Sequence, residues 1–306
     1  MRFFFIGIIF LCVQGFSQQL PAVCSGTLIR LENFHSAYSG NRTIDIWLPD
    51  NYDIGKKYDV LYMHDGQMLF DSSVTWNKQA WDVDDIITRL SKNNTLRDLM
   101  VVGIWNSDKS RHADYFPQKP FESLTKHQKE LIYSAARANG YSVFNDYAIQ
   151  SDNYLKFLVR EVKPLIDSLY STNRGPDNTF IAGSSMGGLI SLYAICEYPE
   201  VFGGAACLST HWPGIFTMEN NPVPEAFVQY LQHHLPNPKT HKIYFDHGDQ
   251  TLDAMYPPLQ KRVDKVMKRK GFTKQNWKTL SFPGEDHSEK AWKKRFEIPL
   301  IFLLGR

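Results

Sequence analysis

Gly183, Ser184, Ser185, Met186 and Gly187 place a serine between two glycines, a pattern that can build a nucleophile. The preceding run at 178–182 is β-branched and aromatic and predicts a buried strand, and residues 188–195 after the turn predict a helix. In such a strand–turn–helix the serine occupies a strained turn, where a side chain at either glycine would collide with its neighbours. The turn exposes the Ser185 hydroxyl. It also points the first amides of the helix at the same spot, where they can stabilise an oxyanion.

A serine hydroxyl needs a histidine as its base, and the histidine needs a carboxylate to orient it. In the α/β-hydrolase fold these groups follow one another as serine, acid and histidine. Residues 277–282 predict a strand, and His287 lies in the loop directly after it, which makes it the expected base. The preceding strand, predicted over 242–246, ends among three aspartates, so position alone leaves the acid open among Asp246, Asp249 and Asp253.

The other nine histidines are better explained as solvated or hydrogen-bonded imidazoles. His64 and His211 follow predicted strands, so both are candidates for the pocket wall. The chain contains no H-E-x-x-H, H-x-x-E-H or paired-cysteine motif. We therefore expect no catalytic metal.

The remaining pattern predicts an α/β fold with a mostly parallel central sheet flanked by helices. An antiparallel pair is expected at 25–36 and 42–48, then strands at 59–63, 100–104 and 203–208 besides those already named. Apolar residues at a 3.6-residue period predict a long helix over 151–170, and a final helix is expected around 288–304. Two long segments, 105–150 with a helical piece near 122–138 and 209–240, are expected to lie over the active site as loop insertions.

The composition of the 306 residues is that of a globular protein, with 43% hydrophobic and 22% charged residues. A formal net charge of +2 gives no reason to expect a nucleic-acid partner. Aromatic residues make up 14% of the chain, and several fall in predicted loops, Trp212 among them. Such residues either form a pocket wall for flat ligands or pack on the body of the domain.

The N-terminus predicts a cleaved signal peptide over 1–17, since Arg2 precedes an apolar run that ends in small residues. The apolar run is too short for a mature membrane helix. We therefore expect a secreted or periplasmic protein with one domain over 18–306 and no membrane contact after cleavage. Cleavage would leave Cys24, Cys196 and Cys207, and the odd number argues against a disulfide framework.

An oxyanion hole needs a second amide besides that of Met186, and the fold takes it from the loop after the third strand. That loop contains Asp65, Gly66 and Gln67, and the Gln67 amide is the expected donor. With Trp81-Asp82, the run 111–117 (RHADYFP), the GSSMGG elbow, the glycine-then-acid loop and His287, the chain resembles the esterase D-like esterases. This family includes feruloyl and acetyl-xylan esterases, siderophore esterases, S-formylglutathione hydrolases and mycolyltransferases.

The resemblance implies a single α/β-hydrolase domain, no cofactor, and ester cleavage through an acyl-enzyme. It favours Asp253 over Asp249 as the acid, because this chain's loop is about two residues longer than the family pattern. It places Trp81, Arg111 and Tyr115 beside the pocket, where we also expect His211 and Trp212. Arg111 is equally compatible with a local ion pair to Asp114.

The sequence thus predicts a secreted serine esterase with Ser185, His287 and Asp253 as its triad. The leading substrate is an acetylated or feruloylated carbohydrate, because an exported protein with many loop aromatics suits such a ligand. The alternatives are a siderophore trilactone esterase, an acyltransferase that uses the same triad, and a non-catalytic glycan-binding relative.

Overall fold

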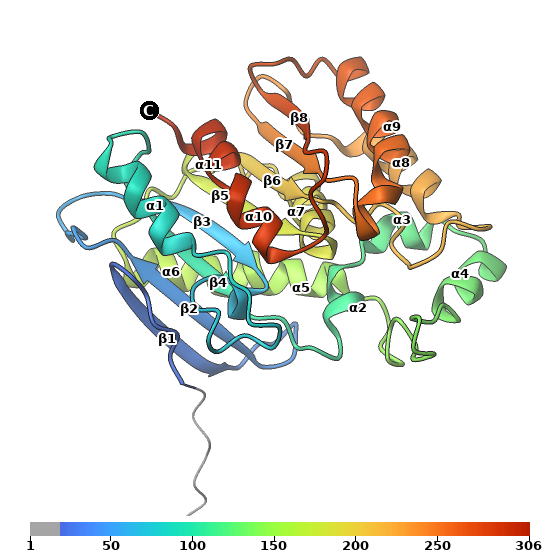
Figure 1. The fold of residues 1–306 in the computed structure, drawn as a ribbon, viewed down its shortest axis with the longest axis horizontal. Helices are drawn as coiled ribbons and strands as arrows, with labels where there is room; N and C mark the ends of the chain where they lie inside the picture. Colours follow the sequence, from blue (N-terminus) through green and yellow to red (C-terminus); the bar gives the residue numbers. More distant parts are fainter. Residues whose placement is uncertain (1–18) are drawn as a thin grey trace, which may run out of the picture.

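The computed structural model describes residues 19–306, so the predicted signal peptide at 1–17 lies outside the described residues. One sheet of eight strands forms the centre, in the order β1-β2-β4-β3-β5-β6-β7-β8 (Figure 1). β1 pairs antiparallel with β2 and β2 with β4, and all other neighbours are parallel. The strands are β1 (Thr27–Phe34), β2 (Arg42–Leu48), β3 (Asp59–His64), β4 (Leu99–Ile104), β5 (Thr179–Ser184), β6 (Gly204–Leu208), β7 (Lys242–His247) and β8 (Trp277–Ser281).

Helices cover both faces of the sheet, which confirms the predicted α/β-hydrolase architecture. Residues of α1 (Val83–Lys92) and α11 (Glu297–Leu304) pack into the apolar core on one face. The core on the other face contains residues of α5 (Ser151–Phe157), α7 (Met186–Glu197), α8 (Val223–His234) and α9 (Tyr256–Arg269). Strands buried on both faces are nearly continuous apolar runs, as in β4, where all six residues are buried.

Two predicted helices are interrupted in the structure. The helix over 151–170 consists of α5, a π-helical turn η2 (Leu158–Val162) and α6 (Lys163–Leu169). The C-terminal helix divides at Phe296 into α10 (Glu289–Arg295) and α11. Pro299 explains this break, because it has no N–H for the Arg295 carbonyl and its ring would collide with that group.

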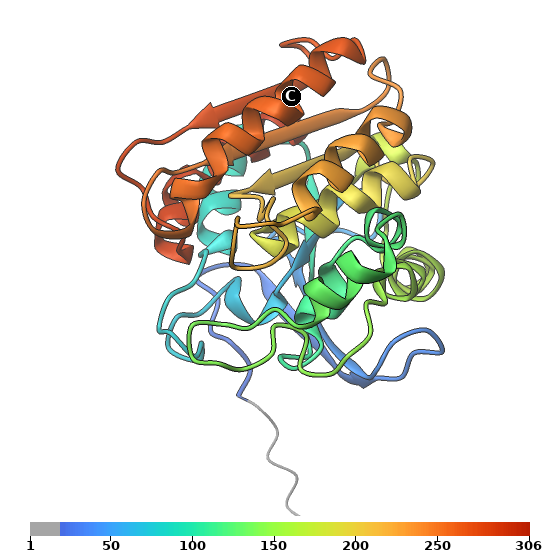
Figure 2. The ribbon, with the colours of Figure 1, turned by 90° about the vertical axis from the view of Figure 1, so that its right-hand side faces the viewer.

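The insertion at 105–150 contains more helix than the sequence indicates. Residues 105–150 form α2 (Arg111–Tyr115), α3 (Gln118–Glu122) and α4 (Lys126–Tyr133), whereas a single helical piece was predicted. Figure 2 shows this green connection along the side of the molecule that lies at the right of Figure 1. The 209–240 insertion contains α8, which packs against α3.

Three cysteines are described, and all are free thiols: Cys196 and Cys207 are buried, and Cys24 is exposed. No helix within residues 19–306 combines the length and apolar character that a membrane crossing needs.

The parallel strands bring the predicted site residues to one edge of the sheet. β3 ends at His64, β5 at Ser184, β7 at His247 and β8 at Ser281, and their carboxyl ends all point the same way. Loops after these strands contain Gln67, Ser185, Asp253 and His287. The topology therefore gathers groups that are far apart in the sequence.

Candidate active site

Ser185 occupies the tight turn between β5 and α7. Its backbone has φ +58° and ψ −123°, a conformation that non-glycine residues rarely adopt. A Cβ on Gly183 would lie 2.7 Å from the backbone carbon of Gly187, so the first glycine is required by the turn. The Ser185 amide donates to the Leu208 carbonyl of the neighbouring strand at 3.0 Å. The sheet thus holds the serine in a strained conformation, as expected at a nucleophile position.

The loop after β8 brings His287 to the loop after β7. Its Nδ1 is 2.6 Å from Oδ1 of Asp253, whose side chain is fully buried. Asp249, the alternative acid, is partly exposed and accepts from the Gly284 amide at 2.8 Å. Asp246, the third candidate, is ion-paired with Arg295 at 3.0 Å. Of these three carboxylates, Asp253 is the one hydrogen-bonded to the imidazole.

The second oxygen of Asp253 is also fully engaged. Oδ2 accepts from the backbone N–H of Gly248 and from the hydroxyl of Ser209, both at 2.6 Å. A Cβ on Gly248 would lie 2.0 Å from the Glu285 carbonyl oxygen, so the two loops that contain the acid and the histidine are in direct backbone contact. Such support fixes the orientation of the carboxylate.

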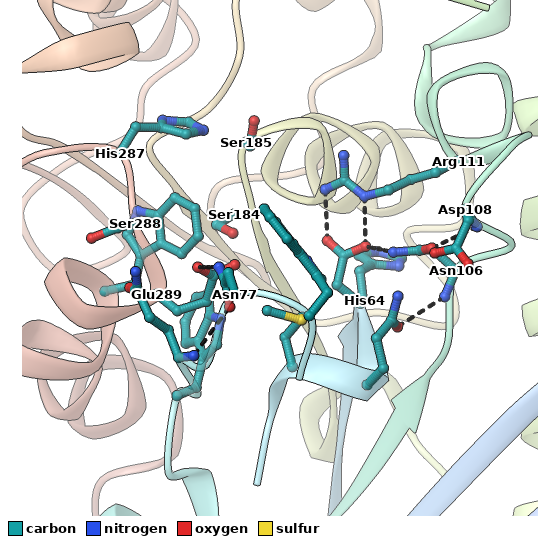
Figure 3. A pocket seen from close by; sticks show the side chains of 17 residues that line it. His64, Asn77, Asn106, Asp108, Arg111, Ser184, Ser185, His287, Ser288 and Glu289 are labelled. Atoms are coloured by element: carbon teal, nitrogen blue, oxygen red, sulfur yellow. Dashed lines mark hydrogen bonds and ion pairs between the residues drawn. The ribbon is translucent and has the colours of Figure 1, made fainter. Parts of the chain in front are cut away.

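Ser185 and His287 both line one cavity, and Figure 3 shows their side chains near each other. Within residues 19–306 the structure contains no hydrogen bond between the Ser185 hydroxyl and the imidazole. Burial raises the pKa of the Tyr256 phenol strongly, the Asp253 carboxylate raises it further, and the Ser185 side chain lowers it by a smaller amount. Loose serine–histidine geometry is common in enzymes without substrate.

Asp65 has the left-handed conformation, with φ +57°, and begins the single turn η1 (Gly66–Met68) that contains Gln67. Gly66 packs on β4, where a Cβ would lie 2.6 Å from the backbone carbon of Gly103. Gln67 lines the same cavity as Ser185. Met186 is the first residue of α7, so its N–H has no intrahelical acceptor. Of the two expected oxyanion donors, Gln67 thus lies in a loop held against β4 and Met186 at the N-terminus of α7.

Arg111 holds this loop through a bidentate ion pair. Its Nε and Nη2 donate to the two oxygens of Asp65, each at 2.7 Å, and Asn106 donates to the same carboxylate at 2.7 Å. Burial disfavours the charged carboxylate, but the guanidinium and these hydrogen bonds outweigh that effect and lower the pKa of Asp65. The sequence left open a pair between Arg111 and Asp114; in the structure Asp114 is paired with Arg42 at 2.7 Å.

The cavity at the sheet edge has a volume of about 640 Å³, within the range of roughly 300–1,000 Å³ typical of small-molecule sites. Both Trp81 and Arg111 line it, in agreement with their expected place beside the pocket. Besides the residues already named, its lining contains apolar, aromatic and polar side chains: Met68, Trp76, Asn77, Gln79, Trp81, Asn106, Asp108, Arg111, Glu289 and Trp292.

Three other residues expected at the pocket are buried and do not line the cavity. Tyr115 is fully buried and its ring lies under the Arg111 guanidinium at 5.2 Å. His211 is buried, bonded through Nδ1 to the Tyr256 hydroxyl at 2.8 Å, and burial keeps its pKa far below the usual range. Trp212 is buried, and its Nε1 donates to Gln260 at 2.9 Å. The prediction failed here because these loops fold back onto the domain, so their aromatic residues join the core.

The part of the cavity wall at 71–80 was missed by sequence reasoning. Trp76 in this segment is 83% exposed. The segment is fastened to α10: Asn77 donates to Glu289 at 2.9 Å, and the Gln79 side chain accepts from the Lys290 amide at 3.1 Å. The sequence signal that could have indicated this wall is Trp76, a tryptophan next to polar residues in a predicted loop.

Among residues 19–306 no group of three or more His, Cys, Asp or Glu side chains has the arrangement of a metal site.

Comparison with known families gives one match over most of the chain. A family model described as "Putative esterase" matches residues 36–303. A curated relative is the uncharacterized protein YbbA of Bacillus subtilis, 24% identical over 276 residues, covering 88% of this chain and 94% of YbbA.

Solved structures with the same fold include esterases. The ferulic acid esterase AmCE1/Fae1A from the anaerobic fungus Anaeromyces mucronatus superposes with a TM-score of 0.62 at 19% identity, covering 95% of each chain. The enterobactin esterase FES from Shigella flexneri has a TM-score of 0.62 at 16% identity, covering 92% of this chain and 60% of FES. At these identities the likeness establishes the shared fold.

Proposed function

We propose that this chain is exported and acts on acylated carbohydrate through Ser185, His287 and Asp253. The chain belongs to the esterase family just described and is a carboxylic-ester hydrolase. The main support is the 2.6 Å hydrogen bond between His287 and the buried Asp253, on the wall of a cavity that also exposes Ser185.

In the proposed mechanism Ser185 attacks the ester carbonyl while His287 accepts its proton. Asp253 accepts a hydrogen bond from Nδ1, which fixes the tautomer with its lone pair on Nε2 and stabilises the imidazolium. The amides of Gln67 and Met186 stabilise the tetrahedral oxyanion. His287 then protonates the leaving alcohol, and water releases the acid from the acyl-enzyme.

The lining of the cavity supports a sugar ester with an acetyl or feruloyl group. An exposed indole at Trp76, next to Asn77 and Gln79, combines an apolar platform with hydrogen-bonding groups, as a polyhydroxylated ring requires. The aromatic rings of Trp81 and Trp292 lie 5.5 Å apart and extend this wall.

The charges of the lining argue against an anionic ferric siderophore. Arg111, which lines the cavity, is already paired with Asp65, and Asp108 and Glu289 add two further carboxylates. Such a cavity repels a polyanion. An acyltransferase would use the same residues, with a sugar hydroxyl in place of water, and a non-catalytic glycan-binding relative would not need the triad.

The test is hydrolysis by the purified protein of methyl ferulate, acetylated xylan and ferric enterobactin, with p-nitrophenyl acetate as a general substrate. We expect turnover of at least one of the first two, and none of the third. Ser185→Ala should lose the burst with p-nitrophenyl acetate. Ser191→Ala, which removes a buried hydroxyl from the same helix, should retain it. Unchanged hydrolysis by Ser185→Ala would refute the triad.

Export is tested separately by the N-terminus of the protein recovered outside the cytoplasm. We expect it to begin near Gln18. Recovery of chains that still begin at Met1 would contradict the predicted cleavage.

A further inference from the structure

Ser209 follows β6 with a backbone conformation that a serine rarely adopts. Its φ is +41° and its side chain is fully buried. Its amide donates to the Asp246 carbonyl at 2.9 Å, which holds the turn in place. A glycine would fit this conformation without strain, so the serine side chain is expected to have a use of its own.

The hydroxyl of Ser209 makes three hydrogen bonds, and their chemistry fixes its direction. The indole Nε1 of Trp292 approaches the oxygen at 2.9 Å and Nη2 of Arg295 at 2.8 Å. Both of these groups are donors only, so the Ser209 oxygen accepts from each. Its single proton is thereby directed to Oδ2 of Asp253 at 2.6 Å.

Arg295 makes this arrangement electrostatically unusual. The guanidinium is buried, ion-paired with Asp246, and 4.0 Å from Oδ2 of Asp253. Its Nε and Nη1 are buried without a hydrogen-bond partner within the described residues. An incompletely paired buried cation destabilises a fold. Its position beside two buried carboxylates compensates for their charge.

We propose that Ser209 is a positioning residue for the reaction, acting through Asp253. Trp292 and Arg295 orient its hydroxyl, and the hydroxyl fixes the Asp253 carboxylate so that Oδ1 faces Nδ1 of His287. The effect on turnover rests on the proposed function, whereas the coupling between Ser209 and His287 rests on the contacts alone.

Two variants separate the effect of the Ser209 hydroxyl from the effect of the strained backbone. Ser209→Ala removes the hydroxyl and keeps the Cβ, and Ser209→Gly removes the hydroxyl and relieves the positive φ. The control is Thr179→Val, which deletes a buried hydroxyl at the opposite end of the sheet, where it donates to the Gly175 carbonyl. Each variant is measured for kcat and KM with p-nitrophenyl acetate, and by proton NMR of the hydrogen on Nδ1 of His287.

We expect both Ser209 variants to lower kcat about tenfold with KM changed less than about twofold, because one hydrogen bond to a charged group is lost. The Nδ1 proton resonance should shift or broaden in both variants and stay unchanged in Thr179→Val. Ser209→Gly should show this even if Ser209→Ala folds poorly.

An unchanged resonance in the two Ser209 variants would overturn the positioning role, whatever the turnover. A resonance that responds to Ser209 in a protein without Ser185-dependent hydrolysis would support the coupling between Ser209 and His287 and refute the proposed catalysis.

Discussion

Replacing Asp253 by asparagine tests the acid directly, because the structure predicts which way the amide will point. If the NH₂ group took the place of Oδ2, it would face the N–H of Gly248 and the hydroxyl of Ser209, both at 2.6 Å. Two hydrogen bonds would be lost, at a cost of about 1 kcal/mol or more each. The amide nitrogen should therefore replace Oδ1.

In that orientation the amide of Asn at position 253 donates toward Nδ1 of His287. In the unmodified protein this nitrogen lies 2.6 Å from Oδ1 of Asp253. The imidazole must then hold its proton on Nε2, so it cannot accept the proton of Ser185. Such a tautomer change costs on the order of 10⁴ in kcat in serine hydrolases with this arrangement, and we expect a loss of about 10³–10⁴ here.

The assay is steady-state hydrolysis of p-nitrophenyl acetate, with the melting temperature measured in parallel. Asp249→Asn is the matched control, since that carboxylate is partly exposed and accepts a hydrogen bond from the Gly284 amide instead of the imidazole. It should retain activity within about threefold, as surface substitutions usually do. Activity of Asp253→Asn within tenfold of the unmodified protein, or a larger loss in Asp249→Asn, would refute the assignment of the acid.

Two further predictions concern the loops that hold the site. Gly248→Ala should destabilise the protein by about 2 kcal/mol and reduce turnover, because its Cβ would lie 2.0 Å from the Glu285 carbonyl oxygen. Gly175→Ala, with nothing within 4 Å, should melt normally, and equal melting of the two variants would contradict the clash. Arg111→Gln should lower the melting temperature at pH 7, since the arginine holds down the pKa of Asp65 against burial. A carboxyl group whose pKa is lower in the folded state stabilises the fold at pH values above its pKa in the unfolded chain. The difference in melting temperature between Arg111→Gln and the unmodified protein should therefore shrink below about pH 4. A difference that stays constant to pH 2 would show that the ion pair is not its cause.

The sequence predicted the sheet and the elbow because both depend on local patterns. Apolar β-branched runs identify parallel strands, and the two glycines around Ser185 reflect a backbone conformation that the structure contains, φ +58°. Parallel pairing then brings the loops after β3, β5, β7 and β8 to one edge. Chain order was enough to place Gln67, His287 and the candidate aspartates at that edge, and the family resemblance favoured Asp253 over Asp249.

The pocket wall was less predictable, because it depends on how loops fold back on the domain. Trp212 and Trp76 are both loop tryptophans, yet the first is 2% exposed and the second 83%. The difference arises from partners distant in sequence, such as Gln260 for Trp212. The role of Ser209 was equally unpredictable from the sequence, since its three side-chain partners lie 44 to 86 positions further along the chain.

The seven residues of α10 serve two parts of the protein at once. Toward solvent, Glu289 and Lys290 fasten the segment that presents Trp76, and on the inner side Trp292 and Arg295 meet Ser209. Substitutions in α10 that change the substrate preference at that wall would thus also affect the alignment of Asp253. Homologues that diverge in α10 should differ in rate as well as in selectivity, while divergence confined to α4 leaves the chemistry intact.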